Sequence, residues 1–302
     1  MKLVTFRTSD RVTHTGVIHN ERVIALDYPT LLALLNDPGG LASARSSLEH
    51  KHTGRVISEY PLSEVVLLAP VPQPPTLRDF YAFEQHVKTA RAKRGLGMIP
   101  EWYEIPTFYF SNISEIYGPD VPIPYPVGSQ ELDFELEIAC VIGREGRDIP
   151  LERAQDYIAG YTIMNDWSAR DFQRKDMKLN LGPGKGKDFA TSLGPWLVTP
   201  DELVARRQGT GPNARYDMTM LARINGREVS RGNFKDIYHS FPQMVAWASR
   251  NARLLPGDVL GSGTVGTGCL LELGTEIHPW LQRGDIVEME IEGIGVLRNT
   301  IM

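Results

Sequence analysis

The stretch ELDFELEIACVIG at residues 131–143 decides the fold of this 302-residue chain. Side chains two positions apart on a β-strand point to the same side of the sheet. Glu135 and Glu137 are therefore expected to point together, with Asp133 behind them. The apolar run IACVIG that follows is typical of a strand that is buried on both faces. The stretch thus predicts a buried strand that carries neighbouring carboxylates.

These carboxylates have two interpretations. An E-x-E pattern most often marks the solvated face of an amphipathic strand, and that ordinary interpretation requires no ligand. Two adjacent carboxylates inside a protein, however, repel each other unless one is protonated or a cation bridges them. Hard cations such as Mg²⁺ and Ca²⁺ accept such oxygen ligands. The buried continuation of the strand favours the cation site.

The chain on either side of this strand is rich in β-structure. Alternating or β-branched sequence predicts further strands at residues 108–114, 157–166, 195–199, 216–226, 258–264 and 285–295. Helices are expected at about 82–94, 167–175 and 240–253. Strands and helices do not alternate regularly, which argues against a doubly wound sheet. The predicted fold class is α+β, mainly β.

A proline-rich segment divides the chain. The sequence APVPQPP at residues 69–75 contains four prolines, which make a stiff extended connection. Before it, strand-like stretches (LVTFRT, GVIHNERVIAL) are followed by the apolar run LLALL and a polar helical stretch. We therefore predict a small N-terminal α+β domain at residues 1–70 and a larger catalytic domain at residues 71–302.

Composition excludes several classes of function. A chain with 42% hydrophobic and 23% charged residues can form a normal globular core. The net charge of −5 gives no general attraction to nucleic acid or to anionic membranes, so neither partner is expected. No stretch approaches the ~20 apolar residues of a transmembrane helix, and the expected location is the cytoplasm. The two cysteines, Cys140 and Cys269, are expected to be buried thiols in a reducing compartment.

Isolated polar residues elsewhere have an ordinary and a functional interpretation. Asp166 ends the predicted strand YTIMND, where a carboxylate either caps the following helix or meets a ligand at the strand end. Asp79 and His86 lie just beyond the proline-rich segment. A single His on such a helix is usually structural, and as a catalyst it would require a carboxylate to orient it.

Two glycine-rich segments are not nucleotide-binding motifs. In GPGKGKDF (182–189) the Walker A pattern would require Gly in place of Leu181 and Ser or Thr in place of Asp188. This segment is interpreted as a flexible loop that presents one or two cations, Lys187 among them. The segment GSGTVGTG (261–268) leads into the apolar run CLLEL, interpreted as a strand and not as the helix that dinucleotide binding requires.

The order of several motifs is more specific than any one of them. They are, from the N-terminus, DFYAFEQH (79–86), LDFELEIA (132–139), YTIMNDWSARDFQ (161–173), GKDF (186–189), GPW (194–196), GSGTVG (261–266) and EGIG (292–295). Over about residues 70–302 this arrangement resembles the fumarylacetoacetate hydrolase superfamily. The resemblance implies a mixed β-sandwich roll and a homodimer.

The resemblance also implies a metal site and a substrate site. The metal ligands would be Asp79, Glu135, Glu137 and Asp166. The metal would be Mg²⁺ in the first place, with Mn²⁺ and Ca²⁺ as alternatives. The substrate-binding positions would be Tyr81, Arg91, Arg94, Tyr109, Gln173 and Thr264. Arg91 and Arg94 are the nearest candidates for the family's substrate arginine, because the matching position is Gly95.

The catalytic residues that the resemblance implies are His86, Glu272, Lys187 and Gln173. Acylpyruvase-like members carry a glutamate a few residues after the histidine, whereas this chain has VKT at 87–89. Fumarylacetoacetate hydrolases proper take the glutamate from a strand after the threonine turn, and LLEL at 270–273 occupies that place. His86 is therefore paired with Glu272.

Together these residues predict a metal-dependent enzyme that hydrolyses a C–C bond in a small 1,3-diketo or 2-oxo acid. The substrate would be of the fumarylacetoacetate, fumarylpyruvate or acylpyruvate type, in the catabolism of aromatic acids. The dedicated His–Glu base favours hydrolysis. A decarboxylase, isomerase or dehydratase acting on a 2-oxo or sugar acid is the alternative on the same scaffold. A catalytically silent metal-binding protein is less well supported, since it would be expected to lose His86 or Lys187 first.

Overall fold

A computed structural model describes residues 1–49 and 56–302 and has a buried strand at the centre of its main sheet. Strand β10 (Leu136–Ile142) has all seven residues buried. It pairs antiparallel with β12 (Ile158–Asp166) on one side and with β20 (Val259–Gly261) on the other. The prediction of a strand buried on both faces is therefore confirmed.

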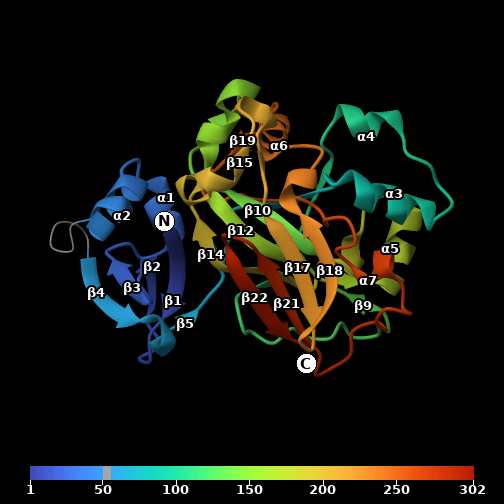
Figure 1. Ribbon diagram of the computed structural model, residues 1–302, viewed down its shortest axis with the longest axis horizontal. Coiled ribbons are helices and arrows are strands. Elements are labelled where there is room, and N and C mark those ends of the chain that lie inside the picture. Colours follow the sequence, from blue (N-terminus) through green and yellow to red (C-terminus); the bar gives the residue numbers. More distant parts are fainter. Residues whose placement is uncertain (50–55) are drawn as a thin grey trace.

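The main sheet has 12 strands and joins the N-terminal region to the rest of the chain. Its other strands are β1 (Lys2–Arg7), β2 (Thr13–His19), β3 (Arg22–Leu26), β4 (Val56–Pro61), β5 (Val66–Leu67), β6 (Leu77–Phe80), β7 (Phe108–Phe110), β8 (Ile116–Tyr117) and β14 (Thr191–Val198). The order is β4-β3-β2-β1-β14-β12-β10-β20-β6-β7, with β5 beside β1 and β8 beside β14. Because β1 pairs with β14, strands from both sides of residue 70 share one sheet (Figure 1). The division into domains 1–70 and 71–302 stays a prediction.

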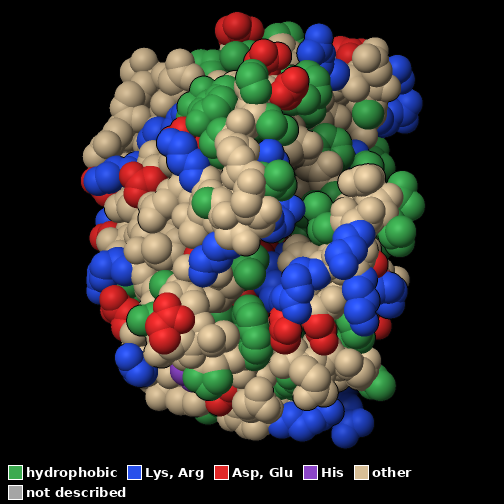
Figure 2. Space-filling model, turned by 90° about the vertical axis from the view of Figure 1, so that its right-hand side faces the viewer, with side chains coloured by type: hydrophobic (Ala, Val, Ile, Leu, Met, Phe, Trp, Pro, Cys, Tyr) green, Lys and Arg blue, Asp and Glu red, His purple; other side chains and the backbone are tan. Residues whose placement is uncertain are grey.

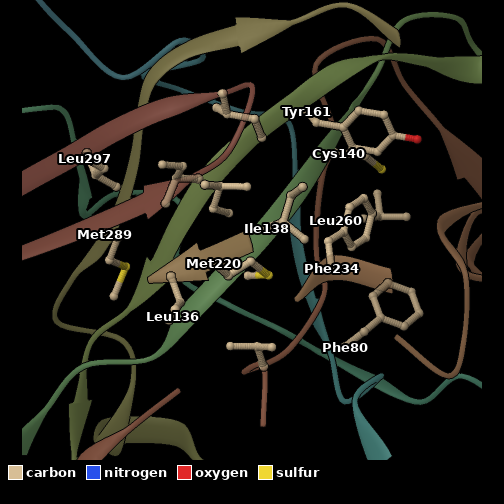
Figure 3. Close-up of a cluster of buried hydrophobic side chains, with 14 of the residues drawn as sticks. Phe80, Leu136, Ile138, Cys140, Tyr161, Met220, Phe234, Leu260, Met289 and Leu297 are labelled. Atoms are coloured by element: carbon tan, nitrogen blue, oxygen red, sulfur yellow. The ribbon is translucent and has the colours of Figure 1, made fainter. Parts of the chain in front are cut away.

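A four-stranded sheet packs against the main one. In the order β18-β17-β21-β22, its strands are β18 (Arg227–Asn233), β17 (Thr219–Ile224), β21 (Ile286–Ile291) and β22 (Gly295–Thr300). Apolar side chains of both sheets form one buried cluster, in which Leu136 and Ile138 of β10 face Met220 of β17 and Met289 of β21 (Figure 3). This apolar layer fixes β10, and with it the carboxylates at its start.

The helices and the remaining short strands connect and cover these sheets. The helices are α1 (Leu31–Asn36), α2 (Gly40–Glu49), α3 (Glu84–Ala92), α4 (Pro100–Glu104), α5 (Arg170–Asp176), α6 (Phe241–Ala248) and α7 (Leu270–Leu273). The 3-10 helices are Leu62–Glu64, Leu151–Tyr157, Met177–Leu179, Gly184–Gly186, Pro200–Arg206, Gly211–Asn213 and Phe234–Asp236. The short strand pairs are β9 (Leu132–Asp133) with β13 (Ser168–Ala169), β11 (Gly146–Arg147) with β19 (Arg253–Leu254), and β15 (Arg207–Gln208) with β16 (Arg215–Tyr216). Helices α3, α5 and α7 lie together at one end of the sheets (Figure 1).

The α+β, mainly β fold class is confirmed, and the predicted helices are present but shorter. They correspond to α3, α5 and α6. Helix α6 starts at a capping box, in which the Ser240 and Gln243 side chains bond each other's backbone N–H groups. The strand predicted at 108–114 is also shorter and ends at Phe110.

The CLLEL run is the main correction to the predicted secondary structure. Residues 270–273 form the short helix α7 and not a strand. The Asp133 carboxylate accepts hydrogen bonds from the backbone N–H groups of Leu270 (2.8 Å) and Leu271 (2.9 Å), and so satisfies the first turn of a helix. Gly274 follows with a φ of 94°, a conformation that favours glycine and ends the helix.

Truncation of Ile138 tests the packing of the two sheets. Its side chain is 0% exposed, so Ile138→Ala is expected to lower the free energy of unfolding by about 2–5 kcal/mol. Urea denaturation measures the change. The control is Val127→Ala, since Val127 is 95% exposed and its truncation should change stability by less than about 0.5 kcal/mol. Equal effects at the two positions would contradict this packing.

Candidate active site

Neighbouring strands of the main sheet bring carboxylates to one place. Asp79 lies on β6, Glu137 on β10 and Asp166 at the end of β12. Strand β12 pairs directly with β10, and β20 lies between β10 and β6. Glu135 immediately precedes β10. Carboxylate oxygens of Asp79, Glu135 and Glu137 lie within 4.8 Å of one another, and all three residues are buried. The two glutamates therefore converge, as the alternation of the strand predicts.

Asp166 joins this cluster through shared partners. Its Oδ2 lies 2.8 Å from Lys187 Nζ, and the same ammonium lies 2.5 Å from Glu135 Oε2. The Tyr109 hydroxyl contacts Asp166 Oδ2 and lies 2.9 Å from Asp79 Oδ2. Helix α5 begins only at Arg170 and has no side-chain cap. The helix-cap interpretation of Asp166 is therefore wrong, and its carboxylate belongs to the cluster.

Two buried cations partly neutralise the carboxylates. Of the two lysines in the glycine-rich segment, Lys185 is exposed, as expected, whereas Lys187 is only 4% exposed and points into the cluster. Arg170 Nη2 lies 2.8 Å from Glu135 Oε1 and 2.8 Å from Asp133 Oδ2. Arg170 was not among the residues predicted from the sequence, although it lies within the NDWSARDFQ motif. Asp133 does stand behind the cluster, where it faces Arg170 and α7.

The pKa values of the carboxylates show how crowded this site is. Burial, with the nearby Asp166 carboxylate, raises the pKa of Asp79 to about 8. Burial and the Asp79 carboxylate hold the pKa of Glu137 well above its usual range. Burial would also raise the pKa of Glu135, but Lys187 and Arg170 outweigh it and lower that pKa. Asp79 and Glu137 therefore tend to hold protons, which a bound cation would displace.

The donor set fits a divalent cation. Glu137 Oε1 and Asp166 Oδ1 are buried and have no hydrogen-bond partner. Buried carboxylate oxygens without partners are costly unless a proton or a cation satisfies them. Carboxylate and hydroxyl oxygens are ligands that Mg²⁺, Mn²⁺ and Ca²⁺ accept, and softer donors are not part of this group. Asp79, Glu135, Glu137 and Asp166 are thus placed to hold such an ion.

A His–Glu pair lies beside the carboxylate cluster. His86 Nδ1, on α3, lies 2.7 Å from Glu272 Oε2, on α7, and both side chains are almost completely buried. The Tyr81 ring stands edge-on to the imidazole at 5.4 Å, and burial raises the pKa of Tyr81 to about 12. The Cys269 thiol donates to Glu272 Oε2 at 3.6 Å. Both cysteines are free and buried, as predicted.

The other predicted site residues surround these groups at different distances. Gln173 accepts a hydrogen bond from Arg170 at 2.9 Å, and the Thr264 hydroxyl is buried without a partner. Arg91 donates to the Gly97 carbonyl at 2.5 Å, and Arg94 donates to the Ala90 carbonyl at 3.2 Å. Arg91 thus bonds the loop after α3, and Arg94 bonds the backbone of α3 itself. Their charges nevertheless act on Tyr81.

A cavity of about 350 Å³ reaches the cluster from the side of α5. Tyr109 and Lys187 line its inner part, and Leu179, Leu181 and Lys185 line its outer part. A larger hollow of about 830 Å³ lies beyond α4, and none of the cluster residues lines it. The smaller cavity is therefore the one that bears on the chemistry.

The face that carries α3, α4 and α5 is rich in basic side chains. Figure 2 shows Lys and Arg side chains around a hollow on this face. The exposed cations on these elements and the loops after them are Lys88, Lys93, Arg94, Arg174, Lys175, Lys178 and Lys185. Lys88, Arg174 and Lys185 already pair with carboxylates on this face. The remaining cations, with Lys175 and Lys178 among them, are the ones that favour anionic ligands.

Comparison with known proteins agrees with this geometry. Residues 76–302 match the family described as fumarylacetoacetate (FAA) hydrolase C-terminal. The chain belongs to the fumarylacetoacetate hydrolase family. Across the whole chain it is 30% identical to the mitochondrial oxaloacetate tautomerase FAHD2A of Homo sapiens, covering 92% of that protein. It is 34% identical to a fumarylacetoacetase of Arabidopsis thaliana over 65% of this chain, but it spans only 57% of that relative, and 58% of a Xenopus laevis oxaloacetate tautomerase.

Solved structures of the family share the whole fold. A 5-carboxymethyl-2-hydroxymuconate delta-isomerase from Mycobacterium smegmatis is 28% identical and superimposes with a TM-score of 0.72, covering 100% of this chain and 99% of that chain. The maleylpyruvate hydrolase of Sphingobium sp. SYK-6, 22% identical with a TM-score of 0.73 over 100% and 99% of the two chains, was solved with manganese(II) and pyruvate. The relatives named here are thus hydrolases, tautomerases and isomerases. No helix in the described part of the chain is long and apolar enough to cross a membrane.

Metal binding is expected to stabilise the protein in a pH-dependent way. Mg²⁺ or Mn²⁺ should raise the Tm, because an ion that binds only the folded state stabilises it. The pKa of Asp79 is about 8 in the folded state against 3.8 for an ordinary Asp, so the folded apo protein binds an extra proton between these values. Its stability should therefore fall as the pH rises from about 4 to about 8, while its metal affinity should increase. Calorimetry with and without chelator measures both trends.

Glu137→Gln is the matched variant for that experiment. It removes one carboxylate of the cluster and should reduce the metal-dependent rise in Tm. The control is Glu228→Gln, since Glu228 pairs with Arg231 on the surface, away from the cluster. An unchanged metal response in Glu137→Gln would exclude this carboxylate as a ligand.

Proposed function

We propose that this enzyme is a metal-dependent hydrolase that cleaves a C–C bond in a small 1,3-diketo or 2-oxo acid. The substrate class is that of fumarylacetoacetate, fumarylpyruvate and acylpyruvates. The observation that carries the proposal is the buried His86–Glu272 pair beside a cluster of carboxylates. Activation of water requires an imidazole that is held in a fixed orientation next to a metal site.

The metal would be held by Asp79, Glu135, Glu137 and Asp166, with Mg²⁺ first and Mn²⁺ or Ca²⁺ as alternatives. When bound, the ion supplies Lewis-acid polarisation of a carbonyl and compensation of enolate charge. The basic face around α3 and α5 supports an anionic substrate. Arg91 or Arg94 would bind its carboxylate once released from the backbone carbonyls they now contact.

His86 would act as the general base. Because Nδ1 faces Glu272 at 2.7 Å, Nε2 is the ring nitrogen left to accept a proton from water. The hydroxide equivalent then attacks the carbonyl carbon. The bond to the neighbouring carbon breaks with its electron pair leaving on that carbon as an enolate, which takes up the proton held by His86. Glu272 keeps the imidazole oriented and compensates its charge after the proton transfer.

Lys187 and Gln173 would stabilise the negative charge that develops on substrate oxygens. Removal of one such donor typically costs about 3–4 kcal/mol of transition-state stabilisation. Tyr81, Tyr109 and Thr264 would line the substrate site, since Tyr81 stands beside the base and Tyr109 against the carboxylates. Although burial lowers the pKa of Lys187, Asp166 and Glu135 raise it by more, and its ammonium group stays charged.

The second candidate is tautomerisation of an oxaloacetate-like 2-oxo acid. It is favoured by the full-length similarity to a human oxaloacetate tautomerase, whereas the fumarylacetoacetase matches cover only part of those proteins. The same base would then move a proton between carbon and oxygen without attack by water. A homodimer and a cytoplasmic location are further proposals that accompany either reaction.

Removal of the imidazole tests the proposed base. His86→Ala is expected to lower kcat by roughly 10²–10⁴-fold, the usual contribution of a general base. Steady-state kinetics on the best substrate measure the loss. The metal-dependent rise in Tm should persist, because His86 is not among the proposed metal ligands. Full activity of His86→Ala would exclude the imidazole from the chemistry.

A panel of substrates with and without chelator separates the two reactions. It contains an acylpyruvate, fumarylpyruvate, fumarylacetoacetate and oxaloacetate, and the products are identified by NMR. Chelator-sensitive splitting of a diketo acid into two acids is the expected result. Faster keto–enol exchange of oxaloacetate without splitting of any diketo acid would instead favour the tautomerase. Catalysis that is fully resistant to chelator would contradict both reactions as proposed.

A further inference from the structure

The short helix α7 is held from both ends, and one of the two contacts comes from the helix that carries His86. Helix α7 has only four residues, too few for a stable helix on its own. Asp133 holds its first turn through the N–H groups of Leu270 and Leu271. At the other end, Lys93 Nζ donates to the carbonyls of Leu271 (2.7 Å) and Glu272 (3.1 Å).

Lys93 and His86 act on α7 from the same face of α3. They are seven residues apart, which is close to two helical turns, so their side chains leave the helix in the same direction. Lys93 lies at the C-cap of α3 and is exposed, yet its ammonium reaches the carbonyl of the residue whose carboxylate meets His86. Bonds of a cation to the last carbonyls of a helix stabilise its final turn.

We propose that Lys93 is a positioning residue that locks Glu272 against His86 by tying the C-terminal end of α3 to the backbone of α7. With α3 docked, the ammonium fixes the backbone of Glu272 while the imidazole meets its side chain. The bonds of the Lys93 ammonium go to the backbone of α7, and the inference rests on the proposed role of His86.

The nearest alternative is that Lys93 merely stabilises α3 or α7. Lys88 provides the comparison, because it is also an exposed lysine of α3 but pairs with Glu84 one turn earlier, at 2.8 Å. A general effect on helix α3 would appear in both lysine variants. An effect that acts through Glu272 would appear only in the Lys93 variant and would vanish when the Glu272 carboxylate is removed.

The test is a double-mutant cycle of Lys93→Met and Glu272→Gln, with Lys88→Met as the control and Lys93→Arg as the conservative variant. Lys93→Met keeps the aliphatic stem and should lower kcat/KM at least about tenfold, because it removes both hydrogen bonds from the charged donor to α7. In the Glu272→Gln background the same change should have little further effect. Lys93→Arg should restore most of the activity, and Lys88→Met should stay close to the unmodified enzyme.

A second measurement requires no substrate and so remains decisive if the proposed reaction is wrong. The imidazole N–H proton of His86, shielded from exchange by its bond to Glu272, is followed by NMR at low temperature. The signal is assigned by its loss in Glu272→Gln. It should broaden or disappear in Lys93→Met and persist in Lys88→Met. An unchanged signal in Lys93→Met, or an equal loss of activity with and without the Glu272 carboxylate, would overturn the proposal.

Discussion

The burial of several carboxylates against one another is the constraint on which the rest of this structure depends. Side by side in a low-dielectric interior, Asp79, Glu137 and Asp166 cannot all be charged without compensation. Lys187 and Arg170 supply part of it, and both are directed at Glu135. The uncompensated side of the cluster is where a proton or a divalent cation must lie. Such a cluster of buried carboxylates adds little to stability. Its presence in the fold therefore points to a role in chemistry.

Asp133 connects this charge balance to the placement of the base. One of its oxygens binds Arg170, whose guanidinium also reaches Glu135 and Gln173, and both oxygens hold the first turn of α7. The group that steadies a proposed metal ligand thus also steadies the helix of Glu272. A buried Asp–Arg pair of this kind contributes little net stability but fixes geometry, because each partner is costly to leave unpaired.

Much of this arrangement was predictable from the sequence, and the failures have physical causes. The buried strand β10 and the convergence of Glu135 with Glu137 follow from alternation and an unbroken apolar run. The helix at 270–273 could not be predicted, because a run of four residues, LLEL, is too short to show a period. Its conformation is set by Asp133, far away in the chain. Burial of Lys187 was missed for a similar reason, since a glycine-rich segment looks flexible until its tertiary partners are known. Arg170 had only its motif as a signal.

The two members of the base, His86 and Glu272, lie on different helices. This division suits the scaffold to reactions that depend on the access of water. The carboxylates come from strands that two packed sheets hold rigid, whereas His86 comes from a peripheral helix whose partner, Glu272, belongs to the body of the protein. If both members lay on α3, the base would be oriented whatever the position of that helix. Divided as they are, the imidazole meets its carboxylate only while α3 packs against α7. Hydrolysis and tautomerisation both require such a base, and they differ in whether a water lies beside Nε2 to be activated.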